Sequence, residues 1–204
     1  KRIVFATGGY GGTEQGFLRS RWMPIRTFIG VTSPFPDFVT EEIKENLAVS
    51  DNRRAGNYFR LLSDKRLLWG RDITAFNHFD TKKSEVLVKK DINFFFSNLI
   101  NRIGGINNLK IDYLWHGKMS YSFHKMPYVG SVSPNVFALT AFGGHGMNSA
   151  PAAAIVLAEY LAGTSTRSHI FNKIPWSWNG STLGPLGAEL IYKTMKIRDR
   201  ISLI

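Results

Sequence analysis

The stretch Phe137-Ala-Leu-Thr-Ala-Phe-Gly-Gly-His-Gly-Met-Asn-Ser149 runs directly into the helix-forming residues 150–163. A short apolar run thus ends in a glycine-rich turn, and the turn opens onto a helix N-terminus. The first backbone N–H groups of a helix lack intrahelical acceptors, and together with the helix dipole they favour an anionic or electron-rich ligand. Gly143, Gly144 and Gly146 have no Cβ atoms, so a flat ligand can approach the main chain. The stretch therefore predicts a ligand site of the kind that a cofactor occupies.

The composition is that of an ordinary globular protein. The chain has 204 residues, of which 44% are hydrophobic and 20% are charged, so it can bury the core of one large or two small domains. It contains no cysteine, which excludes disulfides, thiolate metal sites and cysteine nucleophiles within these residues. His116 and His124 stand alone among aromatic residues, and no metal site is predicted.

The net charge of +11 is typical of proteins that bind nucleic acid or a membrane surface. The basic residues are spread along the chain, however, and the densest groups are the pairs 53–54, 82–83 and 89–90. No nucleic-acid motif accompanies them, so the charge favours a solvated surface or a pocket that attracts an anion. No apolar run approaches the roughly 20 residues of a membrane span, and no secretory signal opens the chain. We therefore predict no nucleic-acid partner, no transmembrane segment and a cytoplasmic location.

The chain opens on a strand pattern. Ile3–Ala6 is a short run typical of a buried strand, and the turn cluster Thr7–Gly12 ends it. A strand so close to the first residue suggests that the chain is the C-terminal part of a longer protein.

Strands and a helix alternate in the rest of the first half. Strand-like segments occupy 21–33, and 37–47 suits a short helix with Asp37 as its cap. The apolar arms 57–62 and 66–69, separated by Ser-Asp-Lys, predict a hairpin.

The second half continues in the same mixed way. A helical pattern runs from 88 to 103, where Gly104-Gly105 stop it. The remaining predicted elements are strands over 110–121 and 136–142, a helix over 148–162 capped by Asn148 or Ser149, a loop over 175–180, and a final basic helix over 186–201. Such a mixture without repeats predicts an α/β (α+β) fold.

Four segments occur in an order that is typical of one family. They are Ile3-Val-Phe-Ala-Thr-Gly-Gly9; Arg21-Trp-Met-Pro-Ile-Arg26 with Thr32-Ser-Pro34; Asn57-Tyr-Phe-Arg60 with Leu67-Leu-Trp-Gly-Arg71; and Trp115-His-Gly117, Met126-Pro-Tyr-Val-Gly130, Asn135-Val136 and Gly143-Gly-His-Gly146. Together they resemble the D-amino-acid-oxidase-like superfamily of FAD-dependent amine oxidoreductases, and most closely its gamma-glutamylputrescine oxidoreductase and glycine/sarcosine oxidase branch.

The resemblance implies part of an FAD/NAD(P)-binding-type domain plus an antiparallel substrate-domain sheet with flanking helices. Residues 1–15 would end the first half of the FAD domain, 16–108 would form the substrate domain, and 109–204 would hold the returning FAD-domain element and C-terminal helices. The family's G-x-G-x-x-G segment, which holds the pyrophosphate, does not occur in this sequence. A missing N-terminal segment or a partner chain is therefore expected to supply it.

The resemblance also implies which residues contact FAD. They are Thr7, Gly8, Gly9, Pro127, Gly130, Gly143, Gly144, His145, Gly146, Met147 and Asn148. Turns that only connect strands, or that only pack a helix on a strand, are the alternative explanation. His145 is either catalytic or a residue that orients its turn. The flavin is expected to be non-covalent because cysteine is absent, although a histidyl link stays open.

Five residues are candidates for the substrate-facing wall: Tyr58, Arg60, Trp69, Arg71 and Trp115. Amines stack favourably on aromatic rings, and an arginine can bind a substrate carboxylate through two hydrogen bonds. Core positions for the aromatic residues and surface positions for the arginines are the alternatives. Gly70 and Arg71 are adjacent here, whereas the family pattern often has a further glycine between them, so the register of this hairpin is open.

The implied reaction is the oxidation of a C–N bond of an amine or amino acid to an imine, with hydride transfer to the flavin. The catalytic residues are not identified, and no lysine can be placed above the flavin, so oxidase and dehydrogenase remain alternatives. The chain alone is expected to be inactive. A non-catalytic basic binding module, derived from a truncated flavoprotein, is the alternative function.

Overall fold

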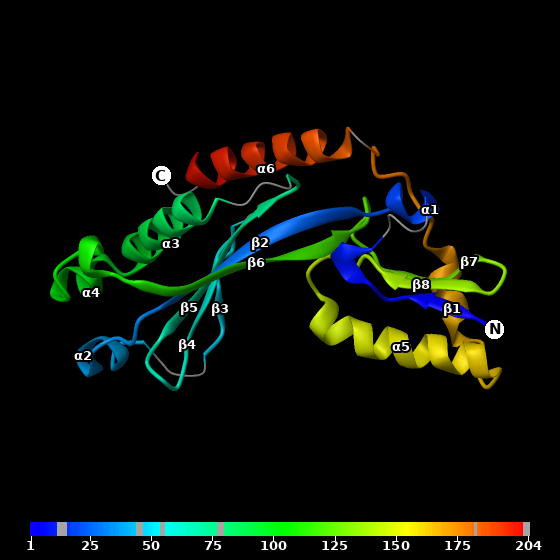
Figure 1. The fold of residues 1–204 in the computed structure, drawn as a ribbon, viewed down its shortest axis with the longest axis horizontal. Coiled ribbons are helices and arrows are strands. Elements are labelled where there is room, and N and C mark those ends of the chain that lie inside the picture. Colours follow the sequence, from blue (N-terminus) through cyan, green and yellow to red (C-terminus); the bar gives the residue numbers. More distant parts are fainter. Residues whose placement is uncertain (12–15, 44–46, 54–55, 77–79, 182, 202–204) are drawn as a thin grey trace. The chain divides into compact units, whose positions relative to one another are not determined.

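The computed structural model describes residues 1–11, 16–43, 47–53, 56–76, 80–181 and 183–201, and strands and helices mix throughout it, as predicted (Figure 1). The chain divides into two compact units, each made from two separate stretches. The first unit consists of Lys1–Ile25 and Lys118–Leu190, and the second of Arg26–Gly117 and Ile191–Ile204.

The first unit is built on a three-stranded sheet with the order β1-β8-β7. β1 (Ile3–Phe5) is parallel to β8 (Val136–Thr140), and β7 (Tyr128–Ser133) is antiparallel to β8. β1 and β8 confirm the strands predicted over 3–6 and 136–142. β7 is missed by the sequence pattern because Gly130 and the serines within it are turn-forming residues, and only pairing with β8 makes it a strand.

β1 is exposed, although its pattern predicts a buried strand. Ile3 is 58% and Val4 42% exposed. β1 stands at the edge of its sheet and pairs with β8 alone among the described strands. The prediction of a strand is therefore right and the prediction of burial is wrong, because burial here requires a neighbour beyond that edge.

α5 (Gly146–Ala162) packs on this sheet. Its Ala153 and Leu157 are buried in one cluster with Val129 and Phe137 of the strands. The structure confirms the predicted C-terminus, where Gly163 adopts a left-handed conformation with φ 74°.

The predicted N-terminus of this helix is wrong. The helix begins two residues earlier than expected, at Gly146, and His145 stands at the N-cap position without a capping side chain. Ser149, one of the two predicted caps, lies inside the helix and donates from Oγ to the His145 carbonyl oxygen at 2.7 Å. The glycines before His145 complete the turn sooner than the capping pattern suggests.

The second unit contains a five-stranded sheet with the order β3-β4-β5-β2-β6. The strands are β3 (Val49–Ser50), β4 (Tyr58–Leu61), β5 (Leu67–Thr74), β2 (Met23–Thr32) and β6 (Ile111–Tyr121). β4 and β5 form the predicted hairpin, and β6 is the predicted strand of 110–121.

Two helices replace the single one predicted over 88–103. α3 (Thr81–Phe95) begins earlier, where the Asp80 side chain accepts a hydrogen bond from the Lys83 backbone N–H at 3.0 Å. α4 (Ser97–Arg102) follows a break at Phe96, which leaves the helical conformation with φ −124°. The break lets the Phe96 ring pack edge-on against Phe59, with 5.3 Å between ring centroids.

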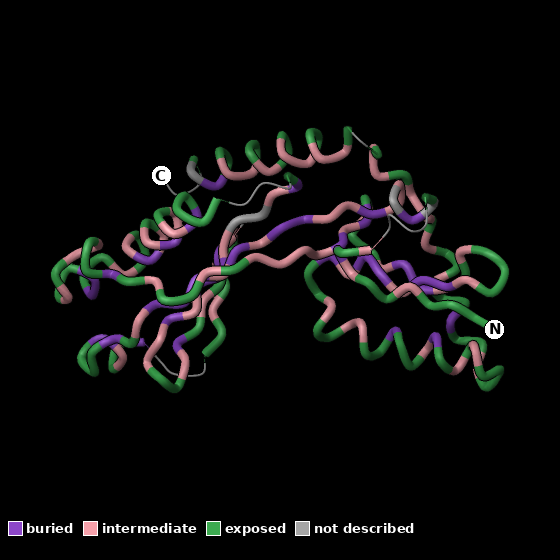
Figure 2. The backbone as a smooth tube through the Cα atoms, viewed as in Figure 1, coloured by how far each residue is buried: buried purple, intermediate pink, exposed green. Residues whose placement is uncertain are grey.

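The core of the second unit lies between the sheet and these helices. Trp69, Val88 and Ile92 are each 0% exposed, and Figure 2 shows the buried residues gathered in the strands and on one side of α3. A side chain at Gly30 of β2 would lie 2.9 Å from Val88, so the glycine allows α3 to lie close to the sheet.

Shorter elements and one long helix complete the described chain. They are η1 (Gly8–Tyr10), α1 (Gly16–Arg19), α2 (Asp37–Thr40), η2 (Ile106–Asn108), η3 (Arg167–Lys173) and α6 (Gly184–Ile201). α6 is the predicted basic helix. α2 is much shorter than the predicted 37–47, and Pro36 rather than Asp37 is its N-cap residue; residues 44–46 of that prediction lie outside the described ones.

Candidate cofactor site and substrate-facing sheet

Three turns of the first unit meet at one end of its sheet. β1 and β8 are parallel, with Phe5 opposite Ala138, so the turns that follow both strands leave from the same end. β7 is antiparallel and begins with Tyr128 opposite Thr140, which brings Pro127 to that end as well. The carboxyl ends of parallel strands are where ligands bind in α/β sheets. The topology therefore assembles the predicted FAD contacts from three distant parts of the sequence.

The glycine turn before α5 offers backbone donors. Gly143 and Gly144 are left-handed, with φ 59° and 87°. Within the described part of the chain, the N–H groups of Gly144, Gly146 and Met147 donate to no protein acceptor. These N–H groups lie at the N-terminus of the 17-residue helix α5, where the positive end of the helix dipole favours an electron-rich ligand.

Ser120 of β6 holds this turn in place. Its carbonyl oxygen accepts from the Gly143 N–H at 2.9 Å, and its side-chain oxygen accepts from the Ala141 N–H at 2.9 Å. Ala141 is fully buried and left-handed, with φ 63°, which is a strained conformation for a residue with a Cβ atom. The sequence pattern does not identify Ser120, since these contacts join residues about twenty positions apart.

Tyr121 also lies against the turn. A Cβ atom added at Gly144 would stand 2.9 Å from the Tyr121 hydroxyl, so only glycine permits this approach. Burial raises the pKa of Tyr121 above the ordinary value for tyrosine, and the phenol therefore stays neutral at physiological pH. Sequence reasoning misses Tyr121 as well. Its place at the end of the long predicted strand is the one feature of the sequence that could have suggested a role at the site.

The side chains that follow the glycines are open to solvent. His145, Met147 and Asn148 are exposed, and Met147 is 92% exposed. The His145 carbonyl oxygen accepts from the backbone N–H groups of Asn148 and Ser149, at 3.3 and 3.2 Å. The main chain of His145 thus shapes the start of α5, while its ring is accessible.

The predicted glycines elsewhere serve different purposes. Gly9 is buried, and a Cβ atom there would lie 2.6 Å from the Lys118 carbonyl oxygen. Gly8 is left-handed with open space beside it, and Thr7 precedes it at the N-cap of η1. Gly130 lies within β7 opposite Ala138, with φ 141° and open space around the missing side chain.

In the second unit, the predicted substrate residues divide between two faces of the sheet. The register pairs Tyr58 with Gly70 and Phe59 with Trp69. Because side chains alternate along a strand, Tyr58 and Arg60 share one face, and Trp69 and Arg71 share the opposite one. The Tyr58 ring covers Gly70, where a Cβ atom would lie 1.9 Å from it.

Trp69 and Arg71 belong to the face covered by α3. Trp69 has no exposed surface, and its ring stacks on Phe59 with 5.1 Å between centroids. Arg71 forms an ion pair with Asp91 of α3, at 2.9 Å from Nε to Oδ2. In this conformation Trp69 offers no surface to a substrate. It occupies a core position, which is the alternative that the sequence analysis gives for its aromatic candidates.

Trp115 joins the open face instead. Its neighbour Leu114 reaches the α3 side, within 3.5 Å of a Cβ atom built on Gly30, so Trp115 points the other way. Trp115 is 43% and Tyr58 39% exposed. Tyr113, two positions before Trp115, is 58% exposed and adds a further aromatic residue that the sequence reasoning misses.

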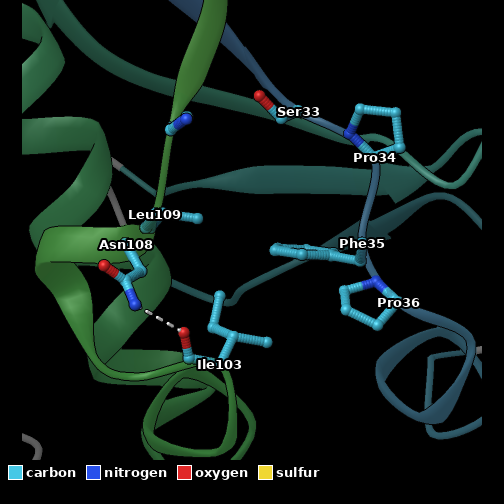
Figure 3. Close-up of a pocket in the computed structure, with 8 residues that line it drawn as sticks. Ser33, Pro34, Phe35, Pro36, Ile103, Asn108 and Leu109 are labelled. Atoms are coloured by element: carbon cyan, nitrogen blue, oxygen red, sulfur yellow. Dashed lines mark hydrogen bonds between the residues drawn. The ribbon is translucent and has the colours of Figure 1, made fainter.

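A separate cavity of about 200 Å³ lies in the second unit (Figure 3). Figure 3 shows Phe35, Ile103 and Leu109 turned toward one another, and Asn108 donating to the Ile103 carbonyl oxygen at 3.0 Å. None of the predicted contacts lines this cavity.

The last group of features concerns the histidines, metal ligands and membrane-spanning helices. Among the residues with assigned structure, no three His, Asp or Glu side chains gather as metal ligands. His116 Nδ1 lies 3.0 Å from Arg26 Nη1, and His124 Nε2 lies 2.8 Å from the Pro175 carbonyl oxygen. None of the described helices combines the length and the apolar character needed to cross a membrane.

The family model described as FAD dependent oxidoreductase matches residues 1–160. A probable oxidoreductase OrdL of Haemophilus influenzae is 28% identical over 97% of this chain and 45% of its own length. Gamma-glutamylputrescine oxidoreductase of Escherichia coli is 28% identical over 86% of this chain and 40% of its own length. The chain thus spans less than half the length of these relatives.

Solved structures share the fold at lower identity. A modified fructosyl peptide oxidase from Aspergillus nidulans has a TM-score of 0.67 at 16% identity, covering 91% of this chain and 46% of its own. Glycine oxidase from Geobacillus kaustophilus has a TM-score of 0.62 at 14% identity, covering 81% of this chain and 42% of its own. These likenesses confirm the predicted α/β (α+β) fold.

Proposed function

Because the chain belongs to the family of FAD-dependent oxidoreductases, we propose that it is the C-terminal portion of an enzyme that oxidises a C–N bond of an amine or amino acid to an imine. The names of its relatives, among them gamma-glutamylputrescine oxidoreductase, support this substrate class. The observation that carries the proposal is the glycine turn before α5, with its three backbone N–H groups that have no acceptor among the described residues.

The residues of this turn fit FAD. The exposed Gly144 and the N–H groups of Gly146 and Met147 would hold an electron-rich edge of the flavin at the positive end of α5. The turns at Thr7–Gly9 and Pro127 leave the same end of the sheet, so they would hold other parts of the cofactor, and Gly130 would approach it from within β7. When bound, FAD supplies the acceptor for the hydride that leaves the substrate carbon.

In this proposal the chain's own groups position ligands and stabilise charge. The free N–H groups stabilise negative charge on the ligand atoms next to them. Ser120 keeps the turn in its strained conformation, and His145 and Asn148 present their side chains beside it. The neutral Tyr121 hydroxyl would offer the ligand a hydrogen-bond donor or acceptor next to Gly144 without adding charge.

The open face of the five-stranded sheet would form the substrate wall. Tyr58 and Trp115 offer aromatic surface to an amine, and Arg60 lies on the same face. Trp69 and Arg71 would support this wall from the opposite face, Trp69 by packing and Arg71 through its ion pair with Asp91.

A missing N-terminal segment, or a partner chain, would supply the G-x-G-x-x-G half of the FAD domain. The exposed Ile3 and Val4 on the edge strand β1 support this, since a further strand there would cover them. Without that half, we expect the 204 residues to be inactive. We propose a cytoplasmic location and no nucleic-acid partner for the complete protein.

The proposed domains are 1–15 and 109–204 for the FAD domain and 16–108 for the substrate domain. The two compact units change after Ile25, Gly117 and Leu190, so residues 191–204 fall in the same unit as 26–117 and not with the rest of the proposed FAD domain.

The test uses the protein from its complete gene. Its absorbance spectrum is recorded before and after anaerobic addition of candidate amines and amino acids. Bound flavin absorbs near about 370 and 450 nm, and bleaching of these bands by an amine is the expected result. A protein that stays colourless when FAD is supplied overturns the proposal and favours the alternative, a non-catalytic basic binding module.

A matched pair of variants tests the turn itself. Gly144→Ala places a Cβ atom beside Tyr121 at a left-handed position, and we expect FAD affinity to fall at least about tenfold. Gly163→Ala introduces similar strain at the other end of α5, where the side chain meets open space. An equal loss of FAD affinity in both variants would mean that destabilisation of α5, and not a contact at the turn, causes the loss.

A further inference from the structure

The β6–β7 turn, which consists of residues 122–127, lies beside the candidate cofactor site. Pro127 at its end is one of the predicted FAD contacts and leads directly into β7. The β6–β7 turn also lies against the glycine turn, since the Lys125 carbonyl oxygen is 3.6 Å from a Cβ atom built on Gly143. Both turns belong to the first unit. A change in the shape of the β6–β7 turn would therefore reach the glycine turn.

The half-buried His124 side chain of this turn uses both of its ring nitrogen atoms. Nδ1 accepts a hydrogen bond from the Met126 backbone N–H at 3.1 Å, and Nε2 lies 2.8 Å from the Pro175 carbonyl oxygen. A backbone N–H can only donate a hydrogen bond, and a carbonyl oxygen can only accept one. Nδ1 is therefore unprotonated and Nε2 carries the proton, which is one specific tautomer of the neutral imidazole.

Further contacts hold the His124 ring in this place. The ring packs edge-on against Tyr128, with 5.4 Å between ring centroids, and Tyr128 stacks on Trp176 with 4.5 Å between centroids. Within the β6–β7 turn, the Ser122 hydroxyl donates to the Met126 carbonyl oxygen at 2.7 Å. His124 thus joins the β6–β7 turn to β7 and to the segment that contains Trp176.

We propose that His124 is a positioning residue of the cofactor site: as a neutral imidazole it fixes the β6–β7 turn beside the glycine turn, and as a cation it releases the β6–β7 turn. The inference rests on the proposed function, because the site that His124 positions is the proposed FAD site. A proton on Nδ1 would face the Met126 N–H, which then loses its acceptor. The Ser122 oxygen, 3.3 Å from Nδ1, can accept from that proton but cannot restore the bond of Met126. Histidines change charge between about pH 5 and 8, so the release belongs to mildly acidic pH.

The described groups around His124 include no anion that would compensate a charge on its ring. The partners of the ring are all neutral, and none of the described carboxylates contacts it. Tyr128 is neutral because burial raises the pKa of its phenol. The charged groups on the adjoining segments are cations: Lys125 is the next residue of the turn, and Arg21 donates to the Trp176 carbonyl oxygen at 2.6 Å. Protonation of His124 would therefore add a further positive charge to this part of the first unit.

The test measures the affinity of the complete protein for FAD at about pH 8 and about pH 5.5, on either side of the usual histidine titration. We expect the affinity to be about three- to tenfold lower at the acidic pH, which is the effect of losing one hydrogen bond. In His124→Asn the amide oxygen can accept from Met126 and does not titrate, so most of the pH dependence should disappear. His124→Leu cannot accept this hydrogen bond, and should bind FAD at both pH values as weakly as the unchanged protein does at the acidic one.

The matched control is His169→Asn, which replaces an exposed histidine of η3 in the same unit. This control should keep the whole pH dependence. His145→Asn tests the histidine of the glycine turn. If FAD binds and the pH dependence disappears in His145→Asn but stays in His124→Asn, the inference is wrong and the proposed function stands. A complete protein that binds no FAD at either pH overturns the proposed function, and the inference with it.

Nitrogen-15 NMR of the histidine rings tests the tautomer without any added FAD. We expect a signal of the neutral Nε2–H form at about pH 8 that is absent from His124→Asn. That signal should change to the imidazolium form at the acidic pH at which FAD affinity falls. A signal of the Nδ1–H form for His124 would overturn the inference, since that tautomer cannot accept from Met126.

Discussion

The two units bury their apolar residues to different degrees. In the second unit, α3 and α4 cover one face of the sheet, and Trp69 and Ile92 have no exposed surface. In the first unit, the edge strand β1 leaves Ile3 and Val4 largely exposed. The second unit therefore has a core that its own helices close, whereas the first has an apolar edge strand whose Ile3 and Val4 no described element covers. The difference predicts that substitutions in the two units will have separable effects.

The largest effect is expected from Trp69→Ala. Removing this fully buried ring from its stack with Phe59 should lower the free energy of unfolding by about 3–5 kcal/mol. Hydrogen exchange followed by mass spectrometry should show the loss of protection in β4 and β5 and not in β7 and β8. Trp178→Ala is the control, because Trp178 is 62% exposed. Equal loss of protection in both sheets would contradict the view that each unit has its own core.

A smaller effect is expected in the first unit from Gly9→Ala. The added methyl group would stand 2.6 Å from the Lys118 carbonyl oxygen, and a backbone atom cannot move aside easily. Overpacking of this kind should cost about 1–3 kcal/mol in thermal unfolding. Gly16→Ala, where a Cβ atom meets open space, should be harmless. An unchanged melting temperature for Gly9→Ala would show that η1 is not held against Lys118.

The next effect concerns the ion pair between Arg71 of the five-stranded sheet and Asp91 of α3. Asp91→Asn leaves the Arg71 guanidinium, whose side chain is only 13% exposed, without its carboxylate. We expect a loss of about 1–2 kcal/mol in urea denaturation. The double variant Arg71→Met with Asp91→Leu should lose less than the sum of the single variants, because no charge is then left buried. Additive losses would mean that the two side chains do not interact.

The smallest effect concerns Asp112 of β6. The hydrogen bond from Ser33, together with the ion pair to Arg66, holds the pKa of Asp112 below its ordinary value. A carboxyl whose pKa is lower in the folded state contributes stability at neutral pH and loses it as the pH falls through the folded value. Asp112→Asn should therefore make the loss of stability below about pH 4 slightly shallower. Denaturation curves from neutral to acidic pH measure this, and an unchanged slope would contradict it.

Local signals account for what the sequence predicts well. The apolar run, the glycines and the alanine-rich helix of 137–163 follow one another directly, so the strand, the turn and the helix could be predicted without knowing any distant contact. The hairpin of β4 and β5 is predicted for the same reason. In both cases neighbouring residues decide the conformation.

Contacts between distant residues account for the failures. Trp69 and Tyr58 are both aromatic residues of one hairpin, and only the register with the neighbouring strand shows that they lie on opposite faces. Ser120 and Tyr121 reach the glycine turn from another strand, so no short motif contains them. The prediction that Ile3 and Val4 are buried is wrong, because their burial depends on a neighbour beyond β1.

Every change between the units falls inside a regular element: after Ile25 within β2, after Gly117 within β6, and after Leu190 within α6. Boundaries between compact regions usually fall in loops, where gene segments can be exchanged without damage to either side. Here any exchange of one unit by recombination would join foreign halves of two strands and a helix. Neither unit can therefore be exchanged at a loop without cutting through β2, β6 or α6.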